Sequence, residues 1–193
     1  MKYFKKIKII SDNDLASELA EMLNANKIKW HRHGQICLNS VKGHEDDYTL
    51  GNGSLYYNWK DLDVKKSNNL LTLPIRDIIY EEDDFTVLCN VFKGTQFEDI
   101  YMQLQHNFKI GRVRLMKSTP KTCLTWHNDT SCRLHYPLKT QTGCFMIIQD
   151  EIMHIPKNEW WLTDTTVKHT ALNSSKEERI HLVVSILDEY ENY

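Results

Sequence analysis

Two histidines and one aspartate in the C-terminal half of the chain have the types and the spacing of a metal site. His127 and Asp129 are two residues apart, so on a strand their side chains point to the same side. His169 lies forty residues beyond Asp129 and supplies a third ligand. Two imidazoles and one carboxylate on one side of an iron ion leave positions open for a cosubstrate and oxygen, as in the non-haem Fe(II) oxygenases. The pattern therefore predicts a redox-active iron site, but it does not identify a substrate.

The same short pattern also arises by chance in a chain with nine histidines. His44 and Asp46 form a second copy of it. That copy lies in a charged, turn-like stretch without strand alternation, so we interpret it as a solvated loop. His127 differs because residues 123–126, which lead into it, are typical of a strand, and because several further elements follow at compatible spacings.

Arg179 follows His169 by ten residues and suits the binding of an acidic cosubstrate. A planar guanidinium binds a carboxylate through two parallel hydrogen bonds and stays charged when it is buried. The open positions of an iron ion accept the keto and carboxylate oxygens of a 2-oxo acid. Iron ligands and arginine together therefore point to an oxidation that consumes such an acid.

A series of motifs accompanies these residues: Arg133-Leu134-His135-Tyr136-Pro137, Gly143-Cys144, Trp161-Leu162-Thr163-Asp164, His169-Thr170-Ala171-Leu172-Asn173-Ser174-Ser175 and Arg179-Ile180-His181-Leu182. In this order they resemble the aspartyl/asparaginyl β-hydroxylase family, and the resemblance covers about residues 110–187. The family consists of double-stranded β-helix dioxygenases that use Fe(II), 2-oxoglutarate and O2 and release succinate and CO2. The resemblance implies the same fold and cofactors for this chain.

The resemblance also implies roles for single residues. By position, His127 and His169 match the family's iron-binding histidines, and Arg179 matches the arginine that binds the distal carboxylate of 2-oxoglutarate. Arg133 and His135 match an Arg-x-His element that approaches the cosubstrate. Hydroxylation of an Asp or Asn side chain is what the family name suggests, and a free amino acid, a peptide or another small metabolite stays open as the substrate.

Two features depart from the family. Asp129 stands where well-studied members lack an acid, which brings this chain closer to the general oxygenases with three protein ligands. The gap from His127 to Arg133 is shorter than in those members, which weakens the assignment of the Arg-x-His element.

The alternation of side chains in the predicted strands agrees with these roles. Arg133 and His135 share one face of their strand. In residues 179–186 the odd positions begin with Arg179 and are mixed, whereas the even positions are all aliphatic, so one face suits packing under helices and the other a barrel mouth. Arg114 either points inward on a neighbouring strand or lies exposed on the sheet.

The overall pattern predicts a mainly β single domain, 1–193, with flanking helices and a double-stranded β-helix, that is, a jelly-roll or cupin-like core, over 110–187. Residues 1–109 are expected to supply supporting elements and rim loops. Predicted strands cover residues 3–10, 111–117, 122–128, 132–139, 143–149, 160–164, 167–172 and 179–187. Predicted helices open at Ser11 with Asp14 and at Thr95 with Glu98, both pairs having the spacing of a capping box. Apolar stripes follow each pair: Leu15, Leu19, Met22 and Leu23, and then Phe97, Ile100, Tyr101, Leu104 and Phe108.

The stretch 46–57 is the candidate for substrate binding. It places Tyr48, Asn52 and Tyr56 near two glycine turns, which suits a loop over a barrel mouth. A hairpin turn with its tyrosines packed on the sheet explains the same residues equally well.

Composition narrows the partners and the compartment. A net charge of −2 gives no general attraction to nucleic acids or to anionic membranes. Five cysteines without Cys-x-x-Cys spacing favour reduced thiols over a zinc ribbon or a disulfide framework. With neither an apolar run of membrane-spanning length nor a signal-peptide pattern, we expect a cytoplasmic enzyme whose partners are 2-oxoglutarate and a small-molecule or peptidyl substrate.

Two alternatives use the same scaffold. A metal-dependent hydrolase or isomerase also uses two histidines and an acid, but it has no evident general base near His127 and gives Arg179 no role. A non-catalytic binding module is disfavoured because all three ligands are present.

Overall fold

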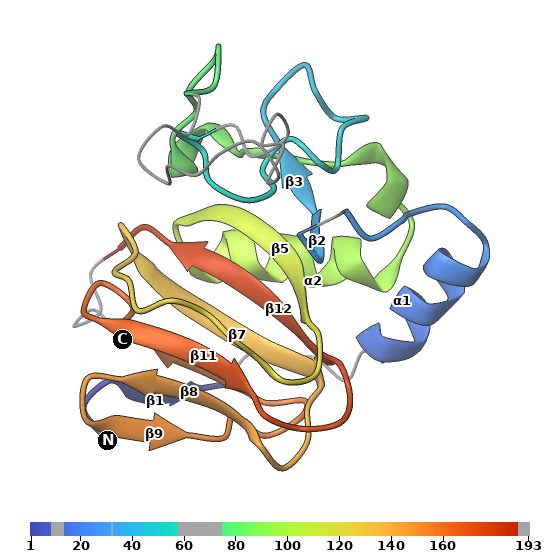
Figure 1. Ribbon diagram of the computed structural model, residues 1–193. Coiled ribbons are helices and arrows are strands. Elements are labelled where there is room, and N and C mark those ends of the chain that lie inside the picture. Colours follow the sequence, from blue (N-terminus) through green and yellow to red (C-terminus); the bar gives the residue numbers. More distant parts are fainter. Residues whose placement is uncertain (9–13, 32, 58–74, 189–193) are drawn as a thin grey trace, which may run out of the picture.

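The computed structural model describes residues 1–8, 14–31, 33–57 and 75–188 (Figure 1). Two α-helices and two 3-10 helices lie among twelve strands in this part of the chain. The helices are α1 Leu15–Asn24, η1 Glu82–Asp84, η2 Asn90–Phe92 and α2 Gln96–Asn107. The strands are β1 Phe4–Ile7, β2 Gln35–Cys37, β3 Asn39–Ser40, β4 Val87–Leu88, β5 Ile110–Ser118, β6 Thr122–Cys123, β7 Cys132–Lys139, β8 Cys144–Ile148, β9 Glu151–Met153, β10 Trp160–Thr163, β11 His169–Asn173 and β12 Arg179–Ile186.

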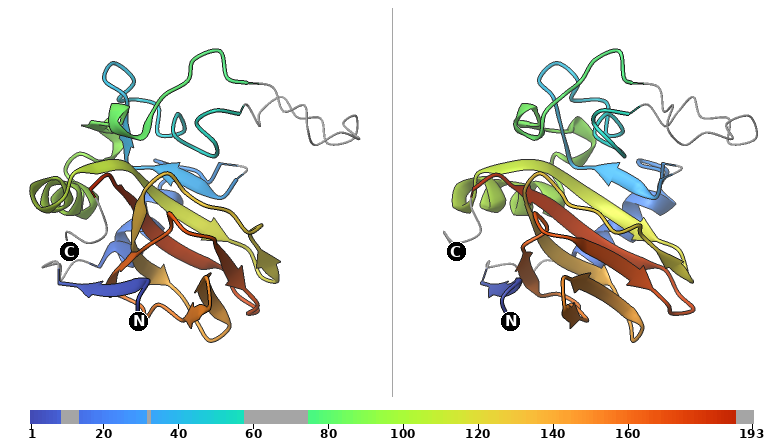
Figure 2. Two further views of the ribbon diagram at one scale, coloured as in Figure 1. Left: turned by 90° about the vertical axis from the view of Figure 1, so that its left-hand side faces the viewer. Right: turned by 60° about the vertical axis from the view of Figure 1, so that its left-hand side comes forward.

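Two antiparallel sheets form the core of the fold. The larger has the order β1-β10-β7-β12-β5-β2, and the smaller has the order β6-β11-β8-β9. From β5 to β12 the chain passes repeatedly from one sheet to the other, and β12 returns to lie between β5 and β7. This is the strand order of a jelly roll, so the predicted double-stranded β-helix is confirmed. In Figure 1 the smaller sheet lies in front of the larger sheet, and α2 lies behind the larger sheet; the left view of Figure 2 shows α2 at the left-hand side of the molecule.

Both helices begin close to their predicted starts. Asp14 is the N-cap of α1, and its side chain accepts from the backbone N of Ser17 at 3.2 Å, whereas Ser11 lies outside the described residues. Thr95 caps α2 by accepting from the backbone N of Phe97. The predicted capping box at Thr95 is only half right, because Glu98 accepts from the backbone N of Gly94 instead.

The apolar core lies between the helices and the outer face of the larger sheet. Buried residues of α1 and α2 form one cluster with the aliphatic face of β12, namely Leu182, Val184 and Ile186. The alternation predicted for this strand is therefore confirmed. The opposite face of the larger sheet carries buried polar side chains instead: Arg112, Arg114, Arg133, His135, Arg179, His181 and Ser185. This polar face is directed between the two sheets, where the candidate site lies.

The predicted strand pattern needs two corrections. A continuous strand over 122–128 is wrong, because only β6 and an isolated bridge between His127 and His169 are present there. Four short strands, β2, β3, β4 and β9, were not predicted, since two or three residues carry no clear alternation. All five cysteines are free thiols. Within the described residues, no helix has both the length and the apolar character needed to cross a bilayer.

Candidate metal centre and the polar interior

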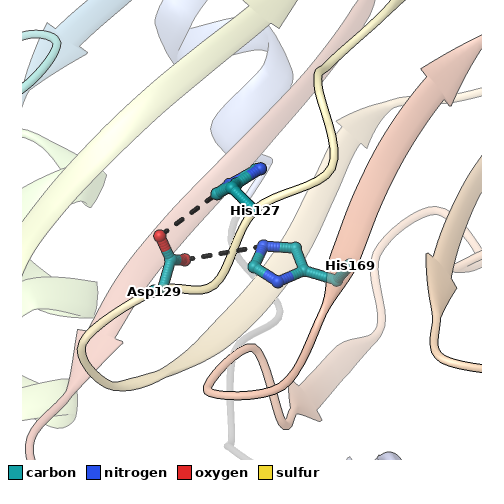
Figure 3. A group of neighbouring side chains, drawn as sticks. All are labelled: His127, Asp129 and His169. Atoms are coloured by element: carbon teal, nitrogen blue, oxygen red, sulfur yellow. Dashed lines mark ion pairs between the residues drawn. The ribbon is translucent and has the colours of Figure 1, made fainter.

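His127, Asp129 and His169 meet at one point (Figure 3). Each offers a ligand atom, and these atoms lie within 4.8 Å of one another. The Nε2 atom of His127 is 3.9 Å from Oδ1 of Asp129, and the Nε2 atom of His169 is 3.8 Å from Oδ2. Separations of this size leave room for one ion between the three groups. The three residues that the sequence proposed as ligands are therefore brought together.

Backbone hydrogen bonds hold the segment between β6 and β7 against β11. His127 and His169 exchange two backbone hydrogen bonds, at 3.1 Å and 2.9 Å. Asp129 donates its backbone N to the carbonyl of Thr165 at 2.9 Å. Although residues 127–129 form no regular strand, these hydrogen bonds hold His127 and Asp129 with their side chains on the same side. This is the arrangement that the alternation of a strand predicts for residues two apart.

The tautomers of both histidines suit metal binding. The Nδ1 atom of His127 is 2.7 Å from the carbonyl of Thr125, and Nδ1 of His169 is 3.0 Å from the carbonyl of Val167. A carbonyl only accepts, so each Nδ1 carries the proton and each Nε2 presents a lone pair to the shared point. Burial also lowers the pKa of His169, which favours the neutral ring.

Asp129 is oriented by Arg133, and Arg133 by Glu82. The Nε atom of Arg133 is 3.2 Å from Oδ2 of Asp129, and its Nη2 donates to Oε1 of Glu82 at 3.3 Å. Its Nη1 donates to acceptors of Ser131 and Cys132. Each nitrogen of this guanidinium therefore already has a protein acceptor, and the contacts of Arg133 are those of a residue that positions Asp129.

Glu82 comes from η1 and joins two arginines of the sheet. Its carboxylate accepts from Nη2 and Nε of Arg112 at 2.8 Å and 3.0 Å, in addition to the contact with Arg133. Burial alone would raise the pKa of Glu82, but the hydrogen bonds and charge of Arg112 and the charge of Arg133 outweigh it and hold the pKa well below its usual range. The carboxylate is therefore ionised throughout the neutral range.

Arg179 lies deeper on the same polar face. It is buried, and its Nη2 lies 3.0 Å from Nδ1 of His181, whose ring stacks edge-on to that of His135 with a centroid distance of 5.6 Å. No carboxylate of a described residue contacts this guanidinium. Burial lowers the pKa of Arg179 to about 10, so the group is still cationic at neutral pH. Burial lowers the pKa of His135 and of His181 well below the usual value, so both rings are neutral.

Several buried polar atoms on this face have no hydrogen-bond partner. Buried polar groups in native proteins are nearly always paired, so a cluster of unpaired ones indicates a place for a polar ligand. The cluster consists of Arg114 Nε, Ser118 Oγ, His135 Nδ1 and Nε2, His181 Nε2 and Ser185 Oγ. All of them belong to β5, β7 and β12.

The residues proposed for substrate binding lie in the segment above the sheet ends. Tyr48 packs against the apolar core, and its hydroxyl accepts from the backbone N of Lys29. Asn52 is buried and accepts from the thiol of Cys37, and Tyr56 is exposed and stacks on the ring of Tyr57. These contacts are internal to the fold. The expectation that the three side chains contact a substrate stays a prediction.

Two surface features lie near these elements. Trp126, immediately before His127 in the sequence, is 49% exposed. A pocket of about 340 Å³ is lined by His44, Asn52, Arg76 and their neighbours, and it contains none of the three candidate ligands.

Sequence reasoning missed Glu82 and left Arg114 undecided. Glu82 sits in an acidic run with Glu81 and Asp83, and no local pattern distinguishes it from its neighbours. Arg112 and Arg114 are two residues apart, so on a strand their side chains face the same side. This spacing fits a buried polar face, but it fits an exposed strand edge equally well. The structure buries Arg114, so its placement on an exposed sheet surface is wrong.

Comparisons with known proteins agree with this architecture. The sequence profile of the family described as aspartyl/asparaginyl beta-hydroxylase matches residues 13–189. The match extends well into the N-terminal half, where the sequence motifs had shown no resemblance. An L-proline cis-4-hydroxylase from Rhizobium meliloti (strain 1021) is 32% identical over 78 residues, which cover 37% of this chain and 28% of the relative. The chain thus matches little more than a quarter of that protein.

Two solved structures are more distant. A cupin domain from Bordetella pertussis Tohama I has 15% identity and a TM-score of 0.36, covering 40% of this chain and 81% of that one. An oxidoreductase of the 2OG-Fe(II) oxygenase family from Burkholderia pseudomallei has 13% identity and a TM-score of 0.36, covering 50% and 52%. Because these scores are low, the fold assignment rests on the strand order.

Proposed function

Because the chain belongs to the aspartyl/asparaginyl β-hydroxylase family, we propose that it is an Fe(II)- and 2-oxoglutarate-dependent hydroxylase. The overall reaction converts a C–H bond of the substrate, O2 and 2-oxoglutarate into the C–OH product, succinate and CO2. One oxygen atom of O2 enters the product and the other enters succinate, so that atoms and electrons balance. The bound iron would supply the activation of oxygen, and the protein supplies position.

One observation carries the proposal: two Nε2 lone pairs and one carboxylate point at a shared site from fixed positions. Nitrogen and oxygen donors of this number and kind fit Fe(II) and leave coordination positions for a cosubstrate. His127, Asp129 and His169 would hold the ion. Arg133 would keep the carboxylate of Asp129 turned toward it.

The unpaired polar interior fits the cosubstrate. Arg179 is buried, cationic and without an acidic partner among the described residues, which suits the distal carboxylate of 2-oxoglutarate. His135 and His181 are neutral rings with unpaired nitrogens beside it. In this assignment His135 contributes to the cosubstrate site, whereas Arg133 affects that site only by orienting Asp129.

The substrate is a small molecule or a peptide side chain. The relative named L-proline cis-4-hydroxylase supports a free amino acid, whereas the family description supports an Asp or Asn side chain. We include both in the proposal.

An anaerobic titration tests the function directly. Metal-free protein receives Fe(II) and then 2-oxoglutarate, and the visible spectrum is recorded for the charge-transfer band of a keto acid chelated to iron. We expect the band in the wild type and its loss in His127→Ala and Asp129→Ala. A wild-type protein that binds iron but gives no band with 2-oxoglutarate would contradict the proposal.

Arg179→Gln separates the cosubstrate site from the metal site. Removing one member of a buried charge pair weakens binding by at least about 30-fold, so we expect the affinity for 2-oxoglutarate to fall by that factor while iron content is unchanged. The matched control is Lys139→Gln, which removes a positive charge from the end of the neighbouring strand, where the amine is exposed and pairs with Glu177. Equal 2-oxoglutarate affinity in both variants would favour a hydrolase or isomerase.

A further inference from the structure

Arg114 is a buried guanidinium that neither the metal centre nor the proposed cosubstrate site uses. It lies on β5 opposite Val183 of β12, and Val183 lies opposite His135 of β7. The three residues therefore form one row across the sheet and face the same interior side. Only 7% of Arg114 is exposed. The side chain is thus directed toward the region that holds His135.

The guanidinium of Arg114 has fewer partners than it needs. Its hydrogen bond is from Nη1 to Oε1 of Gln35, at 3.3 Å, and its Nε has no acceptor. Arg112, two residues earlier on the same face, instead binds Glu82 and the carbonyls of Gly51 and Gly53. A buried guanidinium without an anion is costly to the fold, which indicates a binding role for Arg114.

The buried arginines of this face outnumber its carboxylates. Within the described part of the chain, four buried arginines meet two carboxylates, because Glu82 pairs with Arg112 and Asp129 pairs with Arg133. The distal carboxylate of 2-oxoglutarate lies against Arg179 in the proposed function. Arg114 is then the one buried arginine of this face that no carboxylate contacts among the described residues, and a second organic anion would supply that contact.

The position of Arg114 is fixed from the N-terminal half. Oε1 of Gln35 also accepts from the backbone N of Gly53, so one amide oxygen joins the guanidinium to the loop 50–53. Carbonyls along this loop are bound by Arg76 and Arg112. Because the loop is held by two guanidiniums, Arg114 is placed before any ligand arrives, which reduces the entropic cost of binding.

We propose that Arg114 binds a carboxylate of the substrate, so that the enzyme acts on a small molecule with a free carboxylic acid. This inference rests on the proposed function and narrows its substrate class. Two parallel hydrogen bonds from the guanidinium hold the acid and leave the remainder of the molecule on the side of His135, toward the metal centre. An Asn residue within a polypeptide offers no such anion and is excluded as the preferred substrate.

Binding of matched acids and amides tests this without turnover. Protein loaded with Mn²⁺ and 2-oxoglutarate is titrated with the twenty common L-amino acids and with the carboxamide of each, and binding is measured by calorimetry and by the shift in thermal unfolding. We expect at least one acid to bind at least about 30-fold more tightly than its carboxamide. Equal binding of acid and amide, or no binding of any acid, would overturn the proposal.

A pair of variants separates this site from that of the cosubstrate. Arg114→Gln should weaken the selected acid by at least about 30-fold with 2-oxoglutarate affinity unchanged, and Arg179→Gln should do the reverse. Arg114→Lys, which keeps the charge, should recover part of the acid binding. If Arg114→Gln weakens 2-oxoglutarate as much as Arg179→Gln does, Arg114 belongs to the cosubstrate site and the inference fails. If the wild type does not bind 2-oxoglutarate at all, the proposed function fails instead.

Discussion

The substitution Glu82→Gln should weaken both the fold and the metal centre, although Glu82 touches no candidate metal ligand. Its carboxylate is the shared partner of Arg112 and Arg133, and Arg133 in turn contacts Asp129. A neutral amide keeps the size of the side chain but removes the charge that both guanidiniums face. Arg112 and Arg133 are 7% and 4% exposed, so water does not replace the lost anion.

The expected magnitudes follow from this burial. Removing one partner of a buried ion pair costs about 3–5 kcal/mol because a charge is left without compensation. For a chain of this size each kcal/mol corresponds to about 2–4 °C in Tm, so the Tm of the metal-free protein should fall by roughly 6–20 °C. Loss of a residue that orients a ligand lowers metal affinity by about 10–100-fold. We expect a fall in that range for Fe(II).

Asp83→Asn is the matched control. It lies in the same 3-10 helix and loses the same charge, but its side chain is exposed. Urea unfolding of the metal-free proteins gives the stability, and competition with a chelator gives the metal affinity. A difference of about 1 kcal/mol in unfolding free energy is typical of an exposed ion pair. If Glu82→Gln and Asp83→Asn differ by less than this and bind metal equally, Glu82 is not coupled to Asp129 through Arg133 and the reasoning is wrong.

Three further expectations concern the same interior. Gly111→Ala should reproduce part of the Glu82→Gln phenotype in metal affinity, since a Cβ at this position would lie 2.8 Å from the carbonyl O of Glu82 and would push η1 away. Arg114→Met should raise the unfolding free energy of the ligand-free protein by about 1–3 kcal/mol, measured in urea, and a fall would mean that the guanidinium is already compensated. Metal-free protein should lose about 2–3 kcal/mol of stability per pH unit between pH 6 and pH 5, because burial lowers the pKa of His135 and of His181. Each ring then takes up a proton when the protein unfolds. The stability is fully present above the pKa of the unfolded chain and is lost as the pH falls below it. His181→Gln removes one of the two rings and should reduce the slope by about half.

The strands of the C-terminal half were predicted well from the sequence because their side chains alternate strictly. The strands β7 and β12 match their predicted ranges to within one residue, and the predicted apolar face of α2 is buried at Phe97, Ile100, Tyr101 and Leu104. The segment 122–128 failed for a physical reason. Only Thr122 and Cys123 pair with β11 as a strand; Leu124 and His127 then contact β11 through separate hydrogen bonds. No sequence pattern distinguishes such separate contacts from a continuous ladder.

The proximity of His127, Asp129 and His169 was predictable from the sequence, whereas the residues that orient them were not. A short motif reports which atoms could bind an ion, but the residues that orient Asp129 come from distant parts of the chain. Glu82 is 51 residues before Arg133 in the sequence, and their contact exists only because η1 packs on β5. The predicted role of Arg133 at the cosubstrate came from its place in a motif, while its contacts depend on Glu82, which the motif does not contain.

On the polar face of the larger sheet, the N-terminal half determines which arginines have an acidic partner. The interior arginines carry the same charge and are similarly buried, so the sheet alone does not determine which of them can bind a ligand. The N-terminal half makes the distinction, because η1 brings Glu82 into direct contact with Arg112 and Arg133 but not with Arg114 or Arg179. Among the described residues, these last two guanidiniums contact no carboxylate. Removing the charge of Glu82 would leave Arg133 with Asp129 as its one acidic partner among the described residues, so Glu82→Gln should change the orientation of Asp129 and lower metal affinity.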